Sequence, residues 1–156
     1  MKYGKNLSLS LSIVFSLVGL VAIFFTAILL PFYVEWKCTN TLSMFTGELP
    51  TLGEKIFVYI DGYLLLILAL IADGVLLALL RLTRNGEIFT PKAVSFLKII
   101  ARLTVLVGVL FALLTPWFKM ACVVGFVIIF VGLVVKVVKN VIEEATAIKA
   151  ENDFTI

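Results

Sequence analysis

The stretch NLSLSLSIVFSLVGLVAIFFTAILLPFYV, residues 6–34, decides the fold because it contains no Asp, Glu, Lys or Arg. A transmembrane helix needs about 20 consecutive apolar residues, and this stretch exceeds that length. Three further apolar stretches follow it in the chain. They are residues 56–80, interrupted only by Asp61 and Asp73, residues 99–118, with Arg102 near their start, and residues 120–138, with Lys136 near their end.

The composition of the whole chain agrees with a membrane protein. Of its 156 residues, 62% are hydrophobic and 15% are charged, and the mean hydropathy is +1.18. A soluble domain keeps about a quarter of its residues charged, so lipid must supply part of the solvent here. A backbone in lipid must satisfy its own hydrogen bonds, as a helix does. We therefore predict an all-α fold, a four-transmembrane-helix bundle in a single domain over residues 1–156, with helices at about 7–34, 56–81, 91–118 and 120–150, an outer loop at 35–55 and a cytoplasmic link at 82–90.

Positive residues predict the orientation, because cytoplasmic loops carry an excess of Lys and Arg. If the N-terminus is inside, only Lys37, Lys55 and Lys119 of the 13 Lys and Arg residues lie outside. We therefore expect a multi-pass protein of the cell (plasma) membrane with both termini in the cytoplasm. The lipid bilayer is its first expected partner. The net charge of +3 is attributed to insertion and lipid contact, not to nucleic acid binding.

The fourth predicted helix continues beyond the membrane as an amphipathic cytoplasmic helix. Val134, Val138, Val141, Ala145 and Ile148 recur at steps of four and three, which is the spacing of an apolar seam on a helix. This seam fits three surroundings: the protein's own bundle, the lipid headgroups, or a groove on a partner protein.

Small residues predict which helix faces meet, because they allow close approach in lipid. The stripes are Ser8, Ser12, Ser16, Gly19, Ala22 and Thr26 on the first helix, Ala101, Thr104, Gly108, Ala112 and Thr115 on the third, and Ala121, Gly125 and Gly132 on the fourth. On the second helix, Gly62, Ala69 and Asp73 share a narrow arc. Asp73 is therefore predicted to point into the bundle.

An aspartate inside the membrane needs a partner, a proton or water, because its charge costs at least about 2.5 kcal/mol there. Ser12 and Ser16 of the first helix reach a similar depth to Asp73. Three interpretations stay open: a hydrogen bond to these hydroxyls, an ion pair with Arg102, or a proton- or cation-binding site. Asp61 lies near the outer surface and is expected to be solvated.

The residues that most enzymes need are scarce. The chain has no histidine and only two cysteines, Cys38 and Cys122, which removes the usual general base and a structural zinc site. It has no phosphate loop and no dinucleotide motif. We expect no enzyme activity, catalytic residue, metal or cofactor. Both cysteines fall on the predicted outer side, so a disulfide between them stays open.

Two segments carry a resemblance to a known family: GEIFTPKAVSFLKIIA, residues 86–101, and ENDFTI, residues 151–156. A glycine, an acidic residue and Phe-Thr precede the third helix, and the chain ends in an acidic residue, Asp, an apolar residue and Thr-Ile. The chain thereby resembles the bacterial four-helix membrane proteins of domain-of-unknown-function family 2975, in which leucine is more usual than Phe154. The resemblance implies no established activity. It implies a regulatory partner, because members often look like neighbours of small helix-turn-helix regulators.

Two hypotheses about function follow. In the first, the protein is a regulatory or interaction protein whose cytoplasmic face, residues 85–98 and 134–156, binds a soluble partner such as a helix-turn-helix regulator. Its candidate partner-binding residues are Glu87, Phe89, Thr90, Glu151, Asp153, Phe154 and Thr155. In the second, it is a small transporter, channel subunit or immunity protein that uses Asp73 as a proton or cation site. Four short helices form a poor solute pathway alone, so the second hypothesis requires a homo-oligomer.

Overall fold

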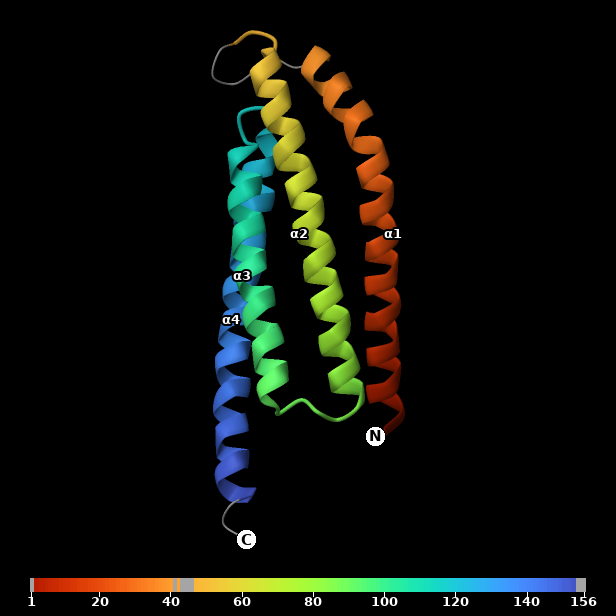
Figure 1. The fold of residues 1–156 in the computed structure, drawn as a ribbon, viewed down its shortest axis with the longest axis vertical. Helices are drawn as coiled ribbons and strands as arrows, with labels where there is room; N and C mark the ends of the chain where they lie inside the picture. The colour runs from red at the N-terminus through yellow and green to blue at the C-terminus, as the bar shows by residue number, and fades with distance from the viewer. Residues whose placement is uncertain (1, 41, 43–46, 154–156) are drawn as a thin grey trace.

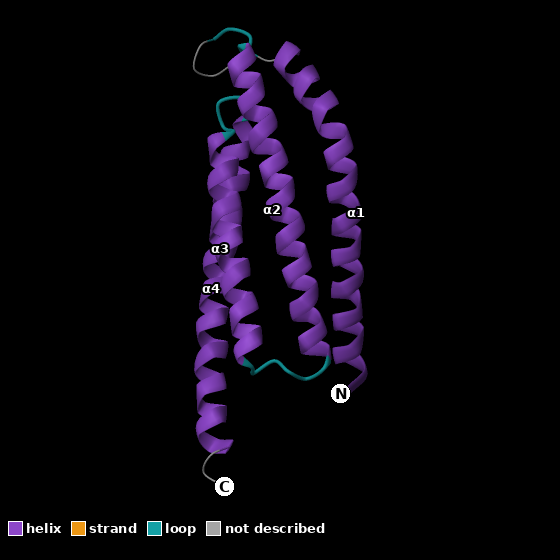
Figure 2. Ribbon diagram, viewed as in Figure 1, coloured by secondary structure: helices purple, strands orange, loops and turns teal. Residues whose placement is uncertain are grey.

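Four helices make up the described part of the chain. The structure is a computed structural model that describes residues 2–40, 42 and 47–153, except for the side chains of residues 2–8 and 153. The helices are α1 (Lys2–Asn40), α2 (Leu52–Arg84), α3 (Pro91–Leu113) and α4 (Lys119–Asp153), and no strand occurs among these residues (Figure 1, Figure 2). Each helix is long and apolar enough to cross a membrane. The predicted all-α fold with four membrane-spanning helices is confirmed.

The helices alternate in direction, so α1 begins and α4 ends at the same end of the molecule (Figure 1). We call this end, which also holds the α2–α3 link, the termini end, and we call the opposite end the loop end. Close backbone contacts join α1 with α2, α2 with α3 and α3 with α4, and they are most extensive between α3 and α4. The helices therefore contact one another in chain order, and each is antiparallel to the next. We describe them as two antiparallel helix pairs, α1–α2 and α3–α4, joined through α2 and α3.

Glycines let α3 and α4 meet at backbone distance. A Cβ atom on Gly125 would lie 2.7 Å from the Gly108 carbonyl oxygen, and one on Gly108 would lie 2.5 Å from Ile129 Cγ1. Real Cβ contacts are essentially never shorter than 3.0 Å, so a larger residue at either position must push the helices apart. The contact between the small-residue stripes of the third and fourth helices is the one that the sequence predicted.

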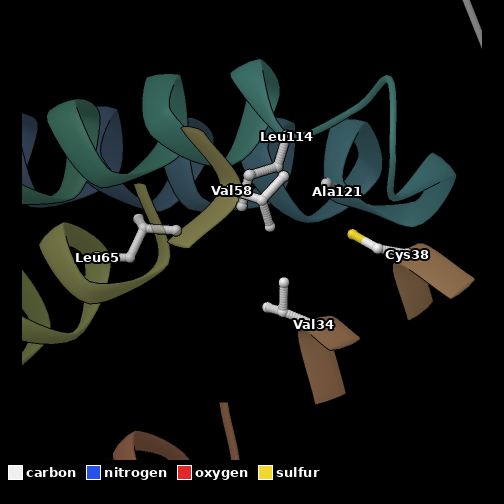
Figure 3. Packing of buried hydrophobic residues seen from close by; sticks show 6 residues of the cluster. All are labelled: Val34, Cys38, Val58, Leu65, Leu114 and Ala121. Carbon is white, nitrogen blue, oxygen red and sulfur yellow. The ribbon is translucent and has the colours of Figure 1, made fainter. Parts of the chain in front are cut away.

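The buried core lies at the loop end, where the two helix pairs converge. Its side chains are those of Val34, Cys38, Val58, Leu65, Leu114 and Ala121 (Figure 3). Aromatic rings pack beside them: Tyr33 stacks on Phe118 with 5.9 Å between ring centroids, and Phe57 lies 5.5 Å from Trp117. At the loop end, buried side chains from α1, α2, α4 and the C-cap of α3 therefore meet.

Two helix ends differ from the predicted boundaries for identifiable reasons. α1 continues past residue 34 to Asn40, whose side-chain Nδ2 donates a hydrogen bond to the Trp36 carbonyl oxygen at 2.7 Å. This bond satisfies one of the carbonyl groups left open at a helix end. α3 stops at Leu113 instead of residue 118, because Pro116 follows and disfavours helical geometry in the residue before it.

The start of α2 also differs from the prediction, which placed it at residue 56. α2 begins at Leu52 because Thr51 and Glu54 form a capping box. The Glu54 carboxylate accepts a hydrogen bond from the Thr51 backbone N–H at 2.7 Å, and the Thr51 hydroxyl accepts one from the Glu54 N–H. The two reciprocal bonds satisfy backbone groups that a helix start leaves open. The predicted outer loop of residues 35–55 is correspondingly shorter.

The apolar seam of α4 does not pack on the protein's own helices. Val134, Val138, Val141 and Ile148 are 47%, 44%, 62% and 53% exposed. The glycines of α4 that contact α3 lie on the opposite face of the helix, as the 3.6-residue period requires. The protein's own bundle is therefore excluded as the surrounding of these four side chains.

The two cysteines are not joined. Cys38 is a buried free thiol and Cys122 is an exposed free thiol. The disulfide that the sequence left open is therefore absent from the structure.

Candidate functional site

The first candidate site is a polar contact between α1 and α2 in their membrane-spanning parts. The Ser16 hydroxyl donates a hydrogen bond to Asp73 Oδ1 at 2.5 Å, and Ser16 is 3% exposed. Gly19 leaves room for the carboxyl group, because a Cβ atom there would lie 3.8 Å from Asp73 Oδ1. Asp73 Oδ2 is buried and has no hydrogen-bond partner among the described residues. The serine thus satisfies only one of the two carboxyl oxygens.

A groove of about 560 Å³ lies beside this contact. Ser12, Ser16 and Asp73 line it together with apolar side chains that include Phe15 and Leu80. Among the described helices, α1 makes close backbone contacts only with α2. The groove is therefore covered by no third helix of the chain, and its polar groups are one carboxyl and two hydroxyls in apolar surroundings.

Arg102 does not belong to this site. Its exposed side chain lines a different groove, between α3 and α4, together with Lys98 and Lys136. No ion pair joins Arg102 to Asp73, whose Oδ2 atom has no partner in the described part of the chain. Of the residues expected near Asp73, the structure brings Ser12 and Ser16 to it but not Arg102.

The prediction that Asp61 is solvated is wrong. Asp61 is 4% exposed, and its Oδ2 atom is buried without a hydrogen-bond partner among the described residues. Val58, Asp61, Leu65 and Leu68 follow the three-and-four spacing of one helix face, and all four are buried. The prediction used only the depth of Asp61 along the helix, whereas the spacing of these four residues shows which face of α2 is buried. The Trp117 indole Nε1 is likewise buried without a partner in the described structure.

The second candidate site is at the termini end and begins with the α2–α3 link. The Thr90 hydroxyl accepts a hydrogen bond from the Ala93 N–H at 3.3 Å and donates one to the Glu87 carbonyl oxygen at 3.1 Å. Thr90 is thus the N-cap of α3 and shapes the link. Gly86 has a φ of +83°, which favours glycine in this turn. The side chains of Glu87 and Phe89 are exposed and accessible to another molecule.

The link leads to a groove between the start of α3 and the last turns of α4. The groove has a volume of about 450 Å³ and is lined by Pro91, Val94 and Ser95 on one side and by Glu143 and Ala147 on the other. The two segments that the sequence assigned to one cytoplasmic face, residues 85–98 and 134–156, therefore lie side by side where the structure describes them.

The tail is only partly described. Glu151 is exposed on the last turn of α4. Asp153 ends that helix, but its side chain lies outside the described part, as do Phe154 and Thr155.

The two sites offer different chemistry. A carboxyl and two hydroxyls in an apolar groove suit a proton or a single cation. Exposed apolar, aromatic and acidic side chains at a helix end suit contact with a protein. No group of three or more His, Cys, Asp or Glu side chains is placed to hold a metal ion within the described ranges.

The fold defines a multi-pass membrane protein with four helices that can span the bilayer. A family profile described as "Protein of unknown function (DUF2975)" matches residues 25–156. The chain belongs to this family, which confirms the resemblance seen in residues 86–101 and 151–156. No curated protein and no solved structure matches the chain.

Proposed function

We propose that this protein is a membrane-embedded regulatory or interaction protein that holds a soluble partner at its termini end. The observation that carries this proposal is the last part of α4, whose apolar side chains are exposed and whose end runs past the start of α3 (Figure 1). We call this part, residues 138–153, the α4 extension. Together with the α2–α3 link and the start of α3, it forms the proposed binding face.

The length of α4 supports this proposal. α4 has 35 residues, whereas its neighbour α3 has 23, and α4 runs past the start of α3 (Figure 1). A hydrocarbon core of about 30 Å takes about 20 helical residues, so roughly 20 Å of α4 projects into water. Val141 and Ile148 are 62% and 53% exposed there. Exposed apolar side chains at helical spacing fit an apolar groove on another protein.

Charge supports placing the binding face in the cytoplasm of a cell. At the loop end, Lys37, Lys55 and Lys119 are accompanied by acidic residues, and Lys55 lies 3.9 Å from the Glu35 carboxylate. The other Lys and Arg residues lie toward the termini end. By the excess of positive residues in cytoplasmic loops, that end faces inward. The family resemblance makes a small helix-turn-helix regulator of a bacterial cell the partner we propose.

Co-purification tests this proposal. The full chain, a chain that ends at Ala150, and the double variant Val141→Ser/Ile148→Ser are solubilised from native cells, and their bound proteins are compared. We expect one soluble protein to accompany the full chain and to be lost from the double variant, with membrane levels unchanged. Val127→Ser is the matched control, because Val127 is 52% exposed on the same face of α4 within the membrane. Full chain and variants that all purify alone and equally stable contradict the proposal.

A second candidate function rests on the contact between Ser16 and Asp73. We propose, as the alternative, a small oligomeric transporter, channel subunit or immunity protein in which Asp73 takes up a proton or a cation. The Oδ2 atom of Asp73, which has no hydrogen-bond partner among the described residues, supports it, as does the groove of about 560 Å³ beside this atom. A second copy of the chain on that side of α1 and α2 supplies the rest of the pathway.

Asp73→Asn in liposomes separates this alternative from a packing role. Loss of ion flux with unchanged thermal stability supports coupling through Asp73. Loss of thermal stability together with flux indicates that Asp73 is a packing residue. Ion flux equal to that of the unmodified protein ends the alternative.

A further inference from the structure

Four cationic side chains line one groove between α3 and α4, on the side of the termini end. Lys98 and Arg102 belong to α3, and Lys136 and Lys139 belong to α4. The groove has a volume of about 480 Å³, and its remaining lining is Ala101, Val105, Gly132 and Leu133. Lys98 and Lys139 border the proposed binding face, whereas Arg102 and Lys136 belong to neither of the functions proposed above. We call this groove the basic groove.

The close packing of α3 on α4 brings the cations together. A Cβ atom on Gly132 would lie 3.0 Å from Val105 Cγ2 and 3.3 Å from Thr104 Cβ, so the side chains of α3 pack directly against the backbone of α4 here. Residues three or four apart lie on the same side of a helix. The cations of each helix have this spacing, and both pairs therefore border the same groove.

Most of this positive charge is not neutralised within the described structure. Lys139 forms an ion pair with Glu143 at 2.5 Å. Lys98, Arg102 and Lys136 form no ion pair and no hydrogen bond with any described residue. Like charges held together in this way raise the local concentration of an anion.

The position of the cations along the helices matches a membrane interface. At 1.5 Å per residue, Lys136 and Lys139 lie ~26 and ~30 Å along α4 from Lys119. If Lys119 marks one boundary of a hydrocarbon core of about 30 Å, these two residues lie at the other boundary. Lys98 lies level with Lys139, because the helices run antiparallel and Gly132 meets Val105. Arg102 lies about one turn deeper on α3, and its long side chain reaches toward the same boundary. Val105 and Leu133 continue the groove toward the membrane centre with an apolar surface. The basic groove thus has a cationic mouth at headgroup level and an apolar inner end.

We propose that the basic groove binds an anionic phospholipid. Its phosphate lies against Lys98, Arg102, Lys136 and Lys139, and an acyl chain follows Val105 and Leu133. Basic pockets between transmembrane helices recognise anionic headgroups in this way. The apolar inner end distinguishes a lipid from free phosphate, which has nothing to place there. The surplus of positive charge favours an anionic headgroup over a neutral or zwitterionic headgroup.

Lipid binding to the full chain in a neutral detergent tests the proposal. Phosphatidylglycerol, phosphatidylcholine or inorganic phosphate is added, and retained lipid is measured by native mass spectrometry alongside the thermal unfolding midpoint. We expect phosphatidylglycerol to be retained and to raise the midpoint, and the other two to do neither. In the double variant Arg102→Gln/Lys136→Gln, affinity for phosphatidylglycerol falls roughly thirtyfold, because each of the two lost cations contributes about 1 kcal/mol.

A charge-matched control separates the groove from general surface charge. Arg81→Gln/Arg84→Gln removes the same charge from the end of α2, outside the basic groove, and it keeps the affinity for phosphatidylglycerol. Lys136→Arg keeps it as well, because the positive charge remains. Equal retention of phosphatidylcholine, an equal shift with phosphate alone, or equal loss in the α2 control overturns the proposal. If the groove variant does not fold, the comparison of the three ligands on the unmodified chain still tests whether the protein binds an anionic phospholipid.

Discussion

The two helix pairs of this protein are held together by opposite means. α3 and α4 meet backbone to backbone at Gly108 and Gly125, where even a methyl group does not fit. α1 and α2 meet through side chains, by the hydrogen bond from Ser16 to Asp73 and by Leu30 over Gly62. Steric fit in lipid depends on every small residue at the contact, whereas a single hydrogen bond there contributes about 0.6 kcal/mol on average. We call α3–α4, which carries the proposed binding surfaces, the rigid pair, and α1–α2, which carries Asp73, the looser pair.

The largest expected effect comes from breaking the rigid pair. Gly125→Ala places a Cβ atom 2.7 Å from the Gly108 carbonyl oxygen, and overpacking of this kind costs about 1–3 kcal/mol. Thermal unfolding in detergent measures the loss. Gly74→Ala on α2 is the matched control, because a Cβ atom there meets nothing within 4 Å. Similar midpoints for the two variants mean that the backbone contact does not hold α3 to α4.

A smaller effect is expected at the looser pair. Ser16→Ala removes the donor to Asp73 Oδ1 and lowers stability by about 0.6–1.7 kcal/mol, the range of hydrogen bonds between membrane helices. A double-mutant cycle with Asp73→Asn isolates the interaction between the two side chains. Thr26→Ala serves as control, since the exposed Thr26 hydroxyl donates its hydrogen bond to the Ala22 carbonyl oxygen of its own helix. A coupling energy of zero shows that packing alone joins α1 to α2.

The smallest effect is expected where the two pairs converge, at Asp61. Its buried Oδ2 atom has no described hydrogen-bond partner to lose, and asparagine has nearly the same volume. Asp61→Asn therefore removes no described hydrogen bond, and we expect it to change stability by less than the ~0.6 kcal/mol that such a bond contributes on average between membrane helices. Chemical unfolding in detergent measures this change next to Asp73→Asn. A clear loss in Asp61→Asn indicates that Asp61 has a bonded partner at the loop end.

The sequence predicted the parts of the fold that depend on one helix at a time. Apolar length gave the four spans, and small-residue spacing gave the contact face of α3 and α4, including Gly108 and Gly125. Local features set the helix ends that the sequence analysis missed: hydrogen bonds at Asn40 and Thr51, and Pro116 after α3. The Thr51–Glu54 capping box carries a readable signature, threonine followed three residues later by glutamate, which places the start of α2 at Leu52.

The sites were harder to predict because they depend on how helices pair. Asp73 and Ser16 were expected at one depth, and their contact required α1 to lie against α2 in the observed register. Lys98 and Arg102 on one helix, and Lys136 and Lys139 on another, each fit ordinary charges reaching for the headgroups. Only the pairing of α3 with α4 makes them one groove. The seam of α4 was visible as a pattern, but a pattern of spacing does not show what covers it.

Site-specific crosslinking in native cells tests the central claim, that the α4 extension holds a soluble partner. A photoreactive residue replaces Val141 in the extension or, as reference, Val127 on the same face of α4 within the membrane. We predict a discrete adduct with one soluble protein at position 141 and none at position 127, and we predict that Ile148→Ser weakens the adduct. Lipid adducts alone at both positions contradict the claim, because the extension then lies on the membrane instead of on a partner.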